Sequence, residues 1–225
     1  MTGPDEAARP ARGVGRPRDG ADLRDPILDQ AELVFAEYGF EGASLRDIAA
    51  RAGVNQALLR YYFGAKQQLF DAVFRRRARV LADQRLARLQ ALLDAPAAPT
   101  PEALIEAYLR PQWDMKRQGA NGAAFVRIQA WVHAAAEEHV LHLRREVYDP
   151  VLDRYIDALA VALPQLPRSL LALRMAFLVG SYLFILNDLG RLDDLTRESA
   201  NRHGEGVVLR DLIRFLAAGL SAPAN

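Results

Sequence analysis

The chain has 225 residues, a formal net charge of +1 and no cysteine. Hydrophobic residues make up 51% and charged residues 25%, which is close to the globular average and excludes a wholly disordered chain. The lack of cysteine excludes a disulfide scaffold, a cysteine nucleophile and a thiolate metal site. The small net charge excludes a protein that is basic throughout, although it allows a local basic patch.

No segment of the sequence predicts a membrane protein or a secreted one. The most apolar run, Met175 to Leu186, is bounded by Arg174 and by Asn187 and has 12 residues, whereas a transmembrane helix needs about 20. The N-terminal residues contain no apolar core of the kind that a secretory signal has. We therefore expect a cytoplasmic protein with no membrane partner.

Residues 1–21 predict a flexible basic arm, because they are rich in glycine and proline and show no apolar periodicity. The following residues 25–38 have helical periodicity, with Asp25 as the expected N-cap, Pro26 at the first helical position and Gly39 as the terminator. Ser44 to Asp47 resembles a capping box that opens a short second helix. Gly53 breaks that helix, and a third is expected from about Asn55 to Tyr62.

The remainder of the chain is also predicted to be helical. A long helix is expected over residues 66–93, an Ala/Pro break follows at 95–101, and Pro150 should kink or split the helix that contains it. No stretch alternates as a strand would, so we predict an all-α fold. The further helices are expected at 102–117, 122–135, 138–163, 167–189 and 205–219.

Residues 44–63 have the lengths of a helix-turn-helix, whose second helix enters the major groove of DNA. An apolar seam should hold its two helices together, formed by Ile48, Ala49, Val54, Leu59 and Phe63. The outward side chains suit DNA, since glutamine can pair with adenine, arginine with guanine, and small apolar groups with the thymine methyl. Expected DNA contacts are Ser44, Arg46, Asn55, Gln56, Ala57, Leu58, Arg60, Tyr61, Tyr62 and, on phosphates, Lys66.

The charge distribution agrees with this interpretation. Residues 42–79 contain eight basic and two acidic side chains, whereas residues 19–41 contain one basic and seven acidic ones. The first helix should therefore face away from DNA. Arg16 and Arg18 of the arm could enter a narrow minor groove, or they could be incidental charges of a disordered tail.

The stretch ILDQAELVFAEYGFEGASLRDIAARAGVNQALLRYYFGAKQQLFDAVF at residues 27–74 resembles the tetracycline-repressor (TetR) family of bacterial regulators. Arg60 stands where tyrosine is commoner in that family, and Leu58 where threonine or serine is. The resemblance implies a three-helix DNA-binding domain, a linking fourth helix, and a divergent helical-bundle domain for ligand binding and dimerisation. We accordingly expect an arm at 1–21, a DNA-binding domain at 22–66 and a ligand and dimerisation domain at 67–225.

The resemblance also implies a ligand cavity among the fifth to eighth helices. Its expected walls are Trp113, Phe125, Ile128, Trp131, Tyr155, Phe177 and Phe184, although aromatic stripes at helical spacing are more often core. Arg127 and His133 could be polar handles. The stretch RREVYDPVLDRYIDALAVALPQLP is loosely similar to regulators that respond to fatty acyl or other hydrophobic molecules, which favours a small hydrophobic or amphipathic effector.

By the same resemblance the last two helices should pair with their copies in a homodimer. Small residues lie in the middle of the expected contact stripe, which comprises Leu173, Ala176, Phe177, Gly180, Ser181 and Phe184. We found no paired acid and base, no metal-ligand spacing and no phosphate-loop pattern, so neither an enzyme nor a cofactor is expected. The sequence thus predicts a ligand-responsive regulator, most plainly a repressor on a near-palindromic operator. Two alternatives remain: a DNA-binding dimer controlled by a protein partner or purely structural, and a helical-bundle enzyme.

Overall fold

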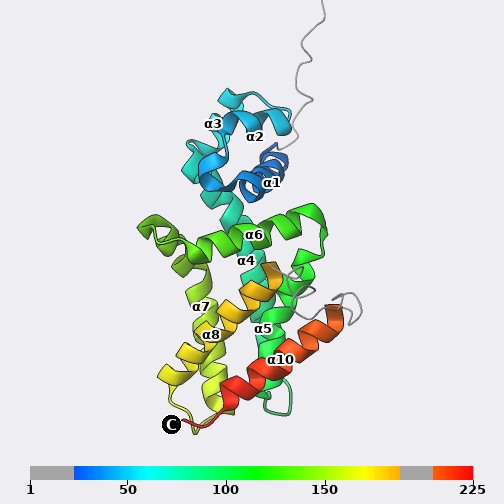
Figure 1. Ribbon diagram of the computed structural model, residues 1–225, viewed down its shortest axis with the longest axis vertical. Helices are drawn as coiled ribbons and strands as arrows, with labels where there is room; N and C mark the ends of the chain where they lie inside the picture. The colour runs from blue at the N-terminus through cyan, green and yellow to red at the C-terminus, as the bar shows by residue number, and fades with distance from the viewer. Residues whose placement is uncertain (1–22, 188–204, 225) are drawn as a thin grey trace, which may run out of the picture.

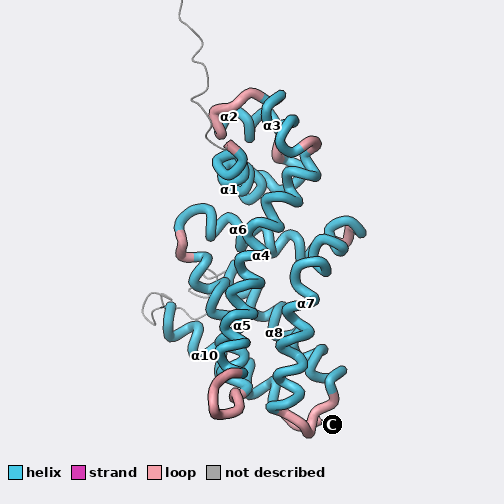
Figure 2. The backbone as a smooth tube through the Cα atoms, turned by 180° about the vertical axis from the view of Figure 1, so that it is seen from behind, coloured by secondary structure: helices cyan, strands magenta, loops and turns pink. Residues whose placement is uncertain are grey.

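A computed structural model of the protein describes residues 23–187 and 205–224. Within those residues every regular element is a helix and none is a strand (Figure 2). The all-α fold is therefore confirmed, while Arg16 and Arg18 lie outside the described residues. The helices are α1 (Arg24–Gly42), α2 (Leu45–Arg51), α3 (Gln56–Phe63), α4 (Lys66–Leu93), α5 (Pro101–Lys116), α6 (Gly119–Ala134), α7 (Glu138–Ala162), α8 (Arg168–Asn187) and α10 (Glu205–Ser221).

Two local expectations need correction. Helix α1 begins at Arg24 and has Leu23 at its N-cap, so Asp25 is not the cap. The Asp25 carboxylate lies 3.6 Å from the Arg76 guanidinium instead, because it takes part in a contact between α1 and α4. Of the two outcomes expected at Pro150, the split does not occur, since α7 continues through the proline, with Val147 and Val151 buried on either side of it.

The molecule is elongated, with α1, α2 and α3 gathered at one end (Figure 1). Helix α4 leaves this end and runs down through the body, where α5, α7, α8 and α10 pack together. Helix α6 lies across the junction and packs on both α1 and α5. The DNA-binding unit expected from the sequence is thus carried at one end, on a helix whose other half belongs to the body.

The buried apolar side chains form two clusters, and their division does not coincide with the expected boundary at residue 66. The first cluster joins α1–α3 to the first half of α4, to α6 and to the first half of α7. It is crossed by ring contacts such as Phe35 against Phe70 at 5.1 Å and Phe74 against Tyr148 at 5.8 Å. The second cluster fills the lower body between α5, α7, α8 and α10. The first core therefore connects the end of the molecule to its body.

A buried polar junction reinforces this connection. Glu32 of α1 is fully buried, and its carboxylate accepts from the guanidinium of Arg77 at 3.1 Å and from the amide of Asn121 at 2.8 Å. The same amide of Asn121, on α6, donates to the carbonyl of Asp29 at 2.8 Å. Burial raises the pKa of Glu32 although these hydrogen bonds and the nearby arginines act to lower it. Residues of α1, α4 and α6 therefore share one desolvated ionic contact.

Candidate functional site

The α2–α3 unit is stabilised by its own side chains. Ser44 Oγ accepts from the amide of Asp47 at 3.1 Å, and Asn55 Oδ1 accepts from the amide of Leu58 at 2.7 Å, so each helix begins with a side-chain cap. The turn between the helices passes through Gly53 at φ +67°, a conformation that side chains resist. The expected apolar seam is confirmed, because Ile48, Ala49, Leu59 and Phe63 are buried and Val54 packs against them.

Helix α3 lies at the end of the molecule (Figure 1). Its outward face presents polar and small apolar groups to solvent. Gln56, Ala57 and Arg60 are exposed, and Tyr61 is 83% exposed with its ring edge-on to Tyr62 at 5.7 Å. This set offers an amide, a guanidinium and a methyl group, which are the groups that read base edges in the major groove. The geometry thus keeps α3 as the helix that could read DNA.

The other expected contacts on this unit lie around that face. Arg46 and Asn55 are exposed, whereas Ser44, Leu58 and Tyr62 are partly buried. Ser44 and Asn55 already use their oxygens as caps, so only the Asn55 amide group remains as a donor there. Only the exposed parts of the Leu58 and Tyr62 side chains could contact DNA.

Lys66 has a different role from the phosphate contact that we expected. Its ammonium donates to the backbone carbonyls of Phe40, Glu41 and Ala43 at 2.7, 3.3 and 3.3 Å, and it lies 4.5 Å from the centre of the Phe40 ring. An ammonium has three N–H donors, and these carbonyls take all of them. Lys66 therefore closes the C-terminal end of α1, and we no longer expect it to bind phosphate.

Most of the basic charge counted on the first half of α4 is also used inside the protein. Arg75 pairs with Glu146 of α7 at 2.9 Å, and the hydrogen bond to Glu146 raises the pKa of Arg75. Arg76 pairs with Asp29 at 2.7 Å, and Arg77 pairs with Glu32. Asp25, Asp29 and Glu32 of α1 are thus partners of arginines on α4. The sequence count overestimated the basic patch, whose outward members on α2 and α3 are Arg46 and Arg60 together with Arg51, itself paired with Glu37 at 2.7 Å.

The expected cavity walls on α5, α6 and α7 are core residues instead. Trp113, Phe125, Ile128 and Tyr155 are each at most 3% exposed and lie within the two apolar clusters. Trp131 is partly buried and packs on Phe40 at 6.0 Å and on Phe70 at 5.2 Å, so it joins α6 to α1 and α4. All five side chains are therefore better described as core packing, the alternative that the sequence left open, than as walls of a ligand cavity.

Sequence reasoning missed a buried polar group between α4, α5 and α6. Arg85 is 2% exposed, and its guanidinium donates to the carbonyl of Tyr108 at 2.9 Å and to Oε1 of Gln112 at 3.0 Å. Gln112 in turn donates to Gln129, and both amides are buried. A signal was present, since Arg85 lies four residues from Leu81 and from Leu89, on the apolar face of its helix.

Two family models match this chain and together cover most of it. The model described as "Bacterial regulatory proteins, tetR family" matches residues 27–73, which include α2 and α3. The model described as "Tetracyclin repressor-like, C-terminal domain" matches residues 106–219, slightly more than half of the chain. The chain belongs to the TetR family. It is a DNA-binding transcriptional regulator of that family.

Two curated relatives match this TetR-family chain over part of its length. The HTH-type transcriptional regulator RutR of Escherichia coli is 37% identical over 91 residues, which are 40% of this chain and 40% of RutR. The HTH-type transcriptional repressor KstR2 of Mycolicibacterium smegmatis is 32% identical over 83 residues, 37% of this chain and 38% of KstR2. The matched part is thus well under half the length of these relatives.

Solved structures show the shared fold over nearly the whole chain. The fatty acid degradation regulator FadR from Bacillus halodurans has a TM-score of 0.66 at 15% identity, covering 91% of this chain and 97% of that one. A TetR-like regulator from Rhodococcus sp. RHA1 has a TM-score of 0.63 at 21% identity, covering 92% and 100%. At these identities the likeness establishes the TetR fold and not the ligand.

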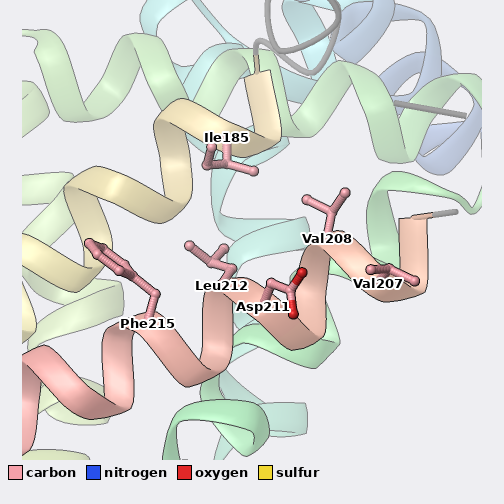
Figure 3. Close-up of a pocket in the computed structure, with 6 residues that line it drawn as sticks. All are labelled: Ile185, Val207, Val208, Asp211, Leu212 and Phe215. Atoms are coloured by element: carbon pink, nitrogen blue, oxygen red, sulfur yellow. The ribbon is translucent and has the colours of Figure 1, made fainter. Parts of the chain in front are cut away.

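The outer face of α8 is apolar and uncovered in the single TetR-family chain. Phe177 is 62% and Phe184 50% exposed, so they do not line an enclosed cavity as we had also expected. The other members of the expected contact stripe, Leu173, Ala176, Gly180 and Ser181, are exposed as well. A neighbouring groove has a volume of about 380 Å³. Figure 3 shows its lining residues, with Ile185 on α8 and the others, from Val207 to Phe215, on α10.

Helix α8 is also the one element in the described part of the chain that is long and apolar enough to cross a membrane. Its 20 residues exceed the 12-residue run counted from the sequence, and 28% of its most apolar window is buried in the single chain. Neighbouring side chains of α5, α7 and α10 cover its inner face.

The described residues hold no group of three or more side chains suited to a metal ion. The imidazole of His139 pairs with the carboxylate of Asp71 at 2.9 Å.

Proposed function

We propose that this regulator is a repressor that binds a near-palindromic operator as a homodimer and is released by a small, largely hydrophobic effector. The observation that carries the proposal is the outward face of α3, where Gln56, Arg60 and Tyr61 are exposed on a helix that caps itself. The repressor role is supported by related proteins, since KstR2 is described as a repressor and IcaR of Staphylococcus aureus as a negative regulator. These names describe the relatives, and for this chain repression is part of the proposal.

The homodimer is supported by the α8 face. Exposed phenylalanines two turns apart on one face of α8 form an apolar surface that a monomer would hold in water at a cost of about 25 cal/mol per Å². A two-fold axis through this face would present two copies of α3 to one side of a duplex, about 34–36 Å apart. Burial of this face in a dimer also agrees with a cytoplasmic protein, which is the location that we propose.

The effector is supported by an open pocket of about 400 Å³ between α7, α8 and the end of α6. Its walls are mostly apolar and include Leu152, Ile156 and Met175, and its polar lining residues are His133, Arg144 and Asp149. This volume is within the range of small-molecule sites, about 300–1,000 Å³. Ligand would act by favouring one arrangement of α6, which bears on α1 through Trp131 and Asn121.

One observation favours the alternative in which a protein partner, and no small molecule, controls the dimer. The aromatic residues expected to enclose a cavity are packed as solid core. Under this alternative the pocket near His133 would be a surface depression, and no small molecule that enters it would change operator affinity. A panel of apolar compounds scored for operator release separates the two functions.

Selection of random duplex DNA by the purified protein tests the central proposal. We expect enrichment of a near-palindrome, and we expect no enrichment with the Arg60→Ala/Tyr61→Ala variant, because its α3 face lacks both groups. Ligand-free protein that enriches no sequence at low salt would overturn operator reading by α3. Equal operator binding by ligand-free and ligand-saturated protein would overturn release by effector and leave DNA binding intact.

A further inference from the structure

The open pocket between α7 and α8 shares part of its rim with the apolar outer face of α8. The pocket has a volume of about 400 Å³, and buried Met175 forms part of its inner wall. Ala176 and Gly180 also line it, and both residues are exposed. The same two residues belong to the contact stripe of α8, beside exposed Phe177 and Phe184. The pocket and the contact stripe therefore occupy adjoining parts of one surface.

The middle of the contact stripe is a notch in the surface of the helix. Gly180 has no side chain, and a Cβ placed there would meet no atom within 4 Å. Phe177 precedes it by three residues and Phe184 follows it by four, so both rings lie on the same face of the helix. They are 62% and 50% exposed. A face with one projecting ring on each side of a hollow can match a second copy of itself related by a two-fold axis, because each copy supplies both shapes.

A second copy of the chain is the occupant that fits this face. TetR-family regulators typically act as dimers, and the contact stripe contains no charged side chain that a second copy would have to desolvate. Small residues at Ala176 and Gly180 let the axis of another helix come close. A helix with its side chains is about 10–12 Å wide, so one that is centred on the contact stripe would extend over the adjoining mouth of the pocket.

The polar groups of the pocket indicate the kind of ligand that it would take. Arg144 and Asp149 of α7 both line it, and their opposite charges leave the lining with no net charge. His133 lines it as well, and burial, with Arg144 nearby, lowers the pKa of His133 to about 4, so this imidazole is neutral at pH 7. The other lining residues are apolar. These walls suit an uncharged apolar molecule better than an acid or an amine, because either charge would face a like charge as well as an opposite one.

We propose that the pocket is completed only in the dimer, where α8 of the second copy forms its outer wall, and that it binds an uncharged apolar molecule there. This inference rests on the proposed function, since it specifies the site and the regulation of the effector. A ligand enclosed between two copies binds the dimer more tightly than the monomer, and by linkage it strengthens the contact between the copies. It also sets the angle at which the copies meet, and with it the separation of their two α3 helices.

The test measures the binding of phenylnaphthylamine, an uncharged apolar dye whose fluorescence rises where water is excluded, to the full-length, DNA-free protein. Sedimentation analysis of the same samples gives the fraction of dimer. We expect the wild-type dimer to bind the dye at least about tenfold more tightly than the Phe177→Asp/Phe184→Asp monomer does. That ratio corresponds to covering about 60 Å² more of the apolar surface of the dye. Saturating dye should also lower the dissociation constant of the wild-type dimer.

Two further variants separate the pocket from the contact between copies. Ala172→Phe places a ring in the pocket at a residue outside the contact stripe, so it should abolish dye binding and leave the dimer intact. Val161→Asp is a control for the added charge, because Val161 is 76% exposed on α7 and does not line the pocket. It should keep both the dye binding and the dimer of the wild type.

Dilution of the wild-type protein repeats the comparison without any substitution, since it converts dimer to monomer while both phenylalanines stay in place. The inference is overturned if the monomer binds the dye as tightly as the dimer, if Ala172→Phe binds it as tightly as the wild type, or if the wild-type dimer binds none. A wild-type chain that is monomeric at every concentration would refute the homodimer of the proposed function as well. Dye that binds as expected without releasing the operator would preserve this site and refute only the release by an effector.

Discussion

The tip formed by α2 and α3 and the outer face of α8 are both uncovered in the single chain, but they are built from opposite chemistry. At the tip, polar groups such as Arg60 and Tyr61 stand on two helices that satisfy their own first turns through Ser44 and Asn55. On α8 the exposed groups are phenylalanines and small residues. The contrast supports the two partners proposed above, because base-reading polar groups suit a nucleic acid and a continuous exposed apolar face suits a second copy of the chain.

The strongest way to break this comparison is to make the α8 face polar. The Phe177→Asp/Phe184→Asp variant should be a monomer in sedimentation analysis, because two carboxylates cannot be buried without partners. Operator affinity should fall about 10²–10⁴-fold, since a dimer gains that much by holding two half-sites. Val80→Asp changes an exposed apolar residue of α4 and should leave the dimer intact. A double variant that remains dimeric would place the interface elsewhere.

The next largest effect is expected at the tip. Arg60→Ala should weaken operator binding by about 1–3 kcal/mol and relax specificity at one base position, if its guanidinium reads a base. A mobility-shift series on single-base operator variants measures this. A uniform loss on all the variants would instead identify Arg60 as a phosphate contact.

Two substitutions of Asn55 can separate its role as a helix cap from its expected contact with DNA. Asn55→Ala should lower the free energy of unfolding by about 1 kcal/mol, because the cap on Leu58 is lost. Asn55→Asp keeps the cap oxygen and should retain the stability, yet it should bind DNA less well because a carboxylate faces phosphates. Thermal unfolding and operator titration of both variants test this, and equal DNA binding by Asn55→Asp would remove Asn55 from the interface.

The smallest change is expected in the salt dependence of binding. Lys66→Ala should leave the slope of log affinity against log salt unchanged, because the ammonium is bound to carbonyls of α1. Arg46→Ala should reduce that slope by about one unit if the exposed guanidinium contacts a phosphate. A shallower slope for Lys66→Ala would restore the phosphate contact that the sequence predicted.

Features that depend on a few neighbouring residues could be predicted from the sequence. The cap at Ser44, the turn at Gly53 and the bounds of α4 are of this kind, since each depends on residues within one helical turn. The partners of Lys66 and of Arg75 to Arg77 could not, because they come from α1 and α7, far away in the chain.

The C-terminal half shows the same limit in another form. Helical spacing indicated an apolar stripe, but it could not tell the inner face of α8 from the outer one, so Phe177 was assigned to two places at once. The sequence analysis did not single out Arg85, although it lies four residues from Leu81 and from Leu89 on the buried face of α4. Both cases needed the packing of other helices to decide them.

The apolar cluster that joins α1–α3 to α4, α6 and α7 has a consequence for how the chain denatures. Phe70 and Phe74 of α4 lie within it beside Phe35 and Phe125, so the end that carries α3 has no separate interior of its own. Melting one part removes the packing of the other. A scanning calorimeter should therefore record a single heat-absorption peak that takes α2 and α3 along with the upper body, and a fragment that stops at residue 66 should behave as an unstructured polypeptide.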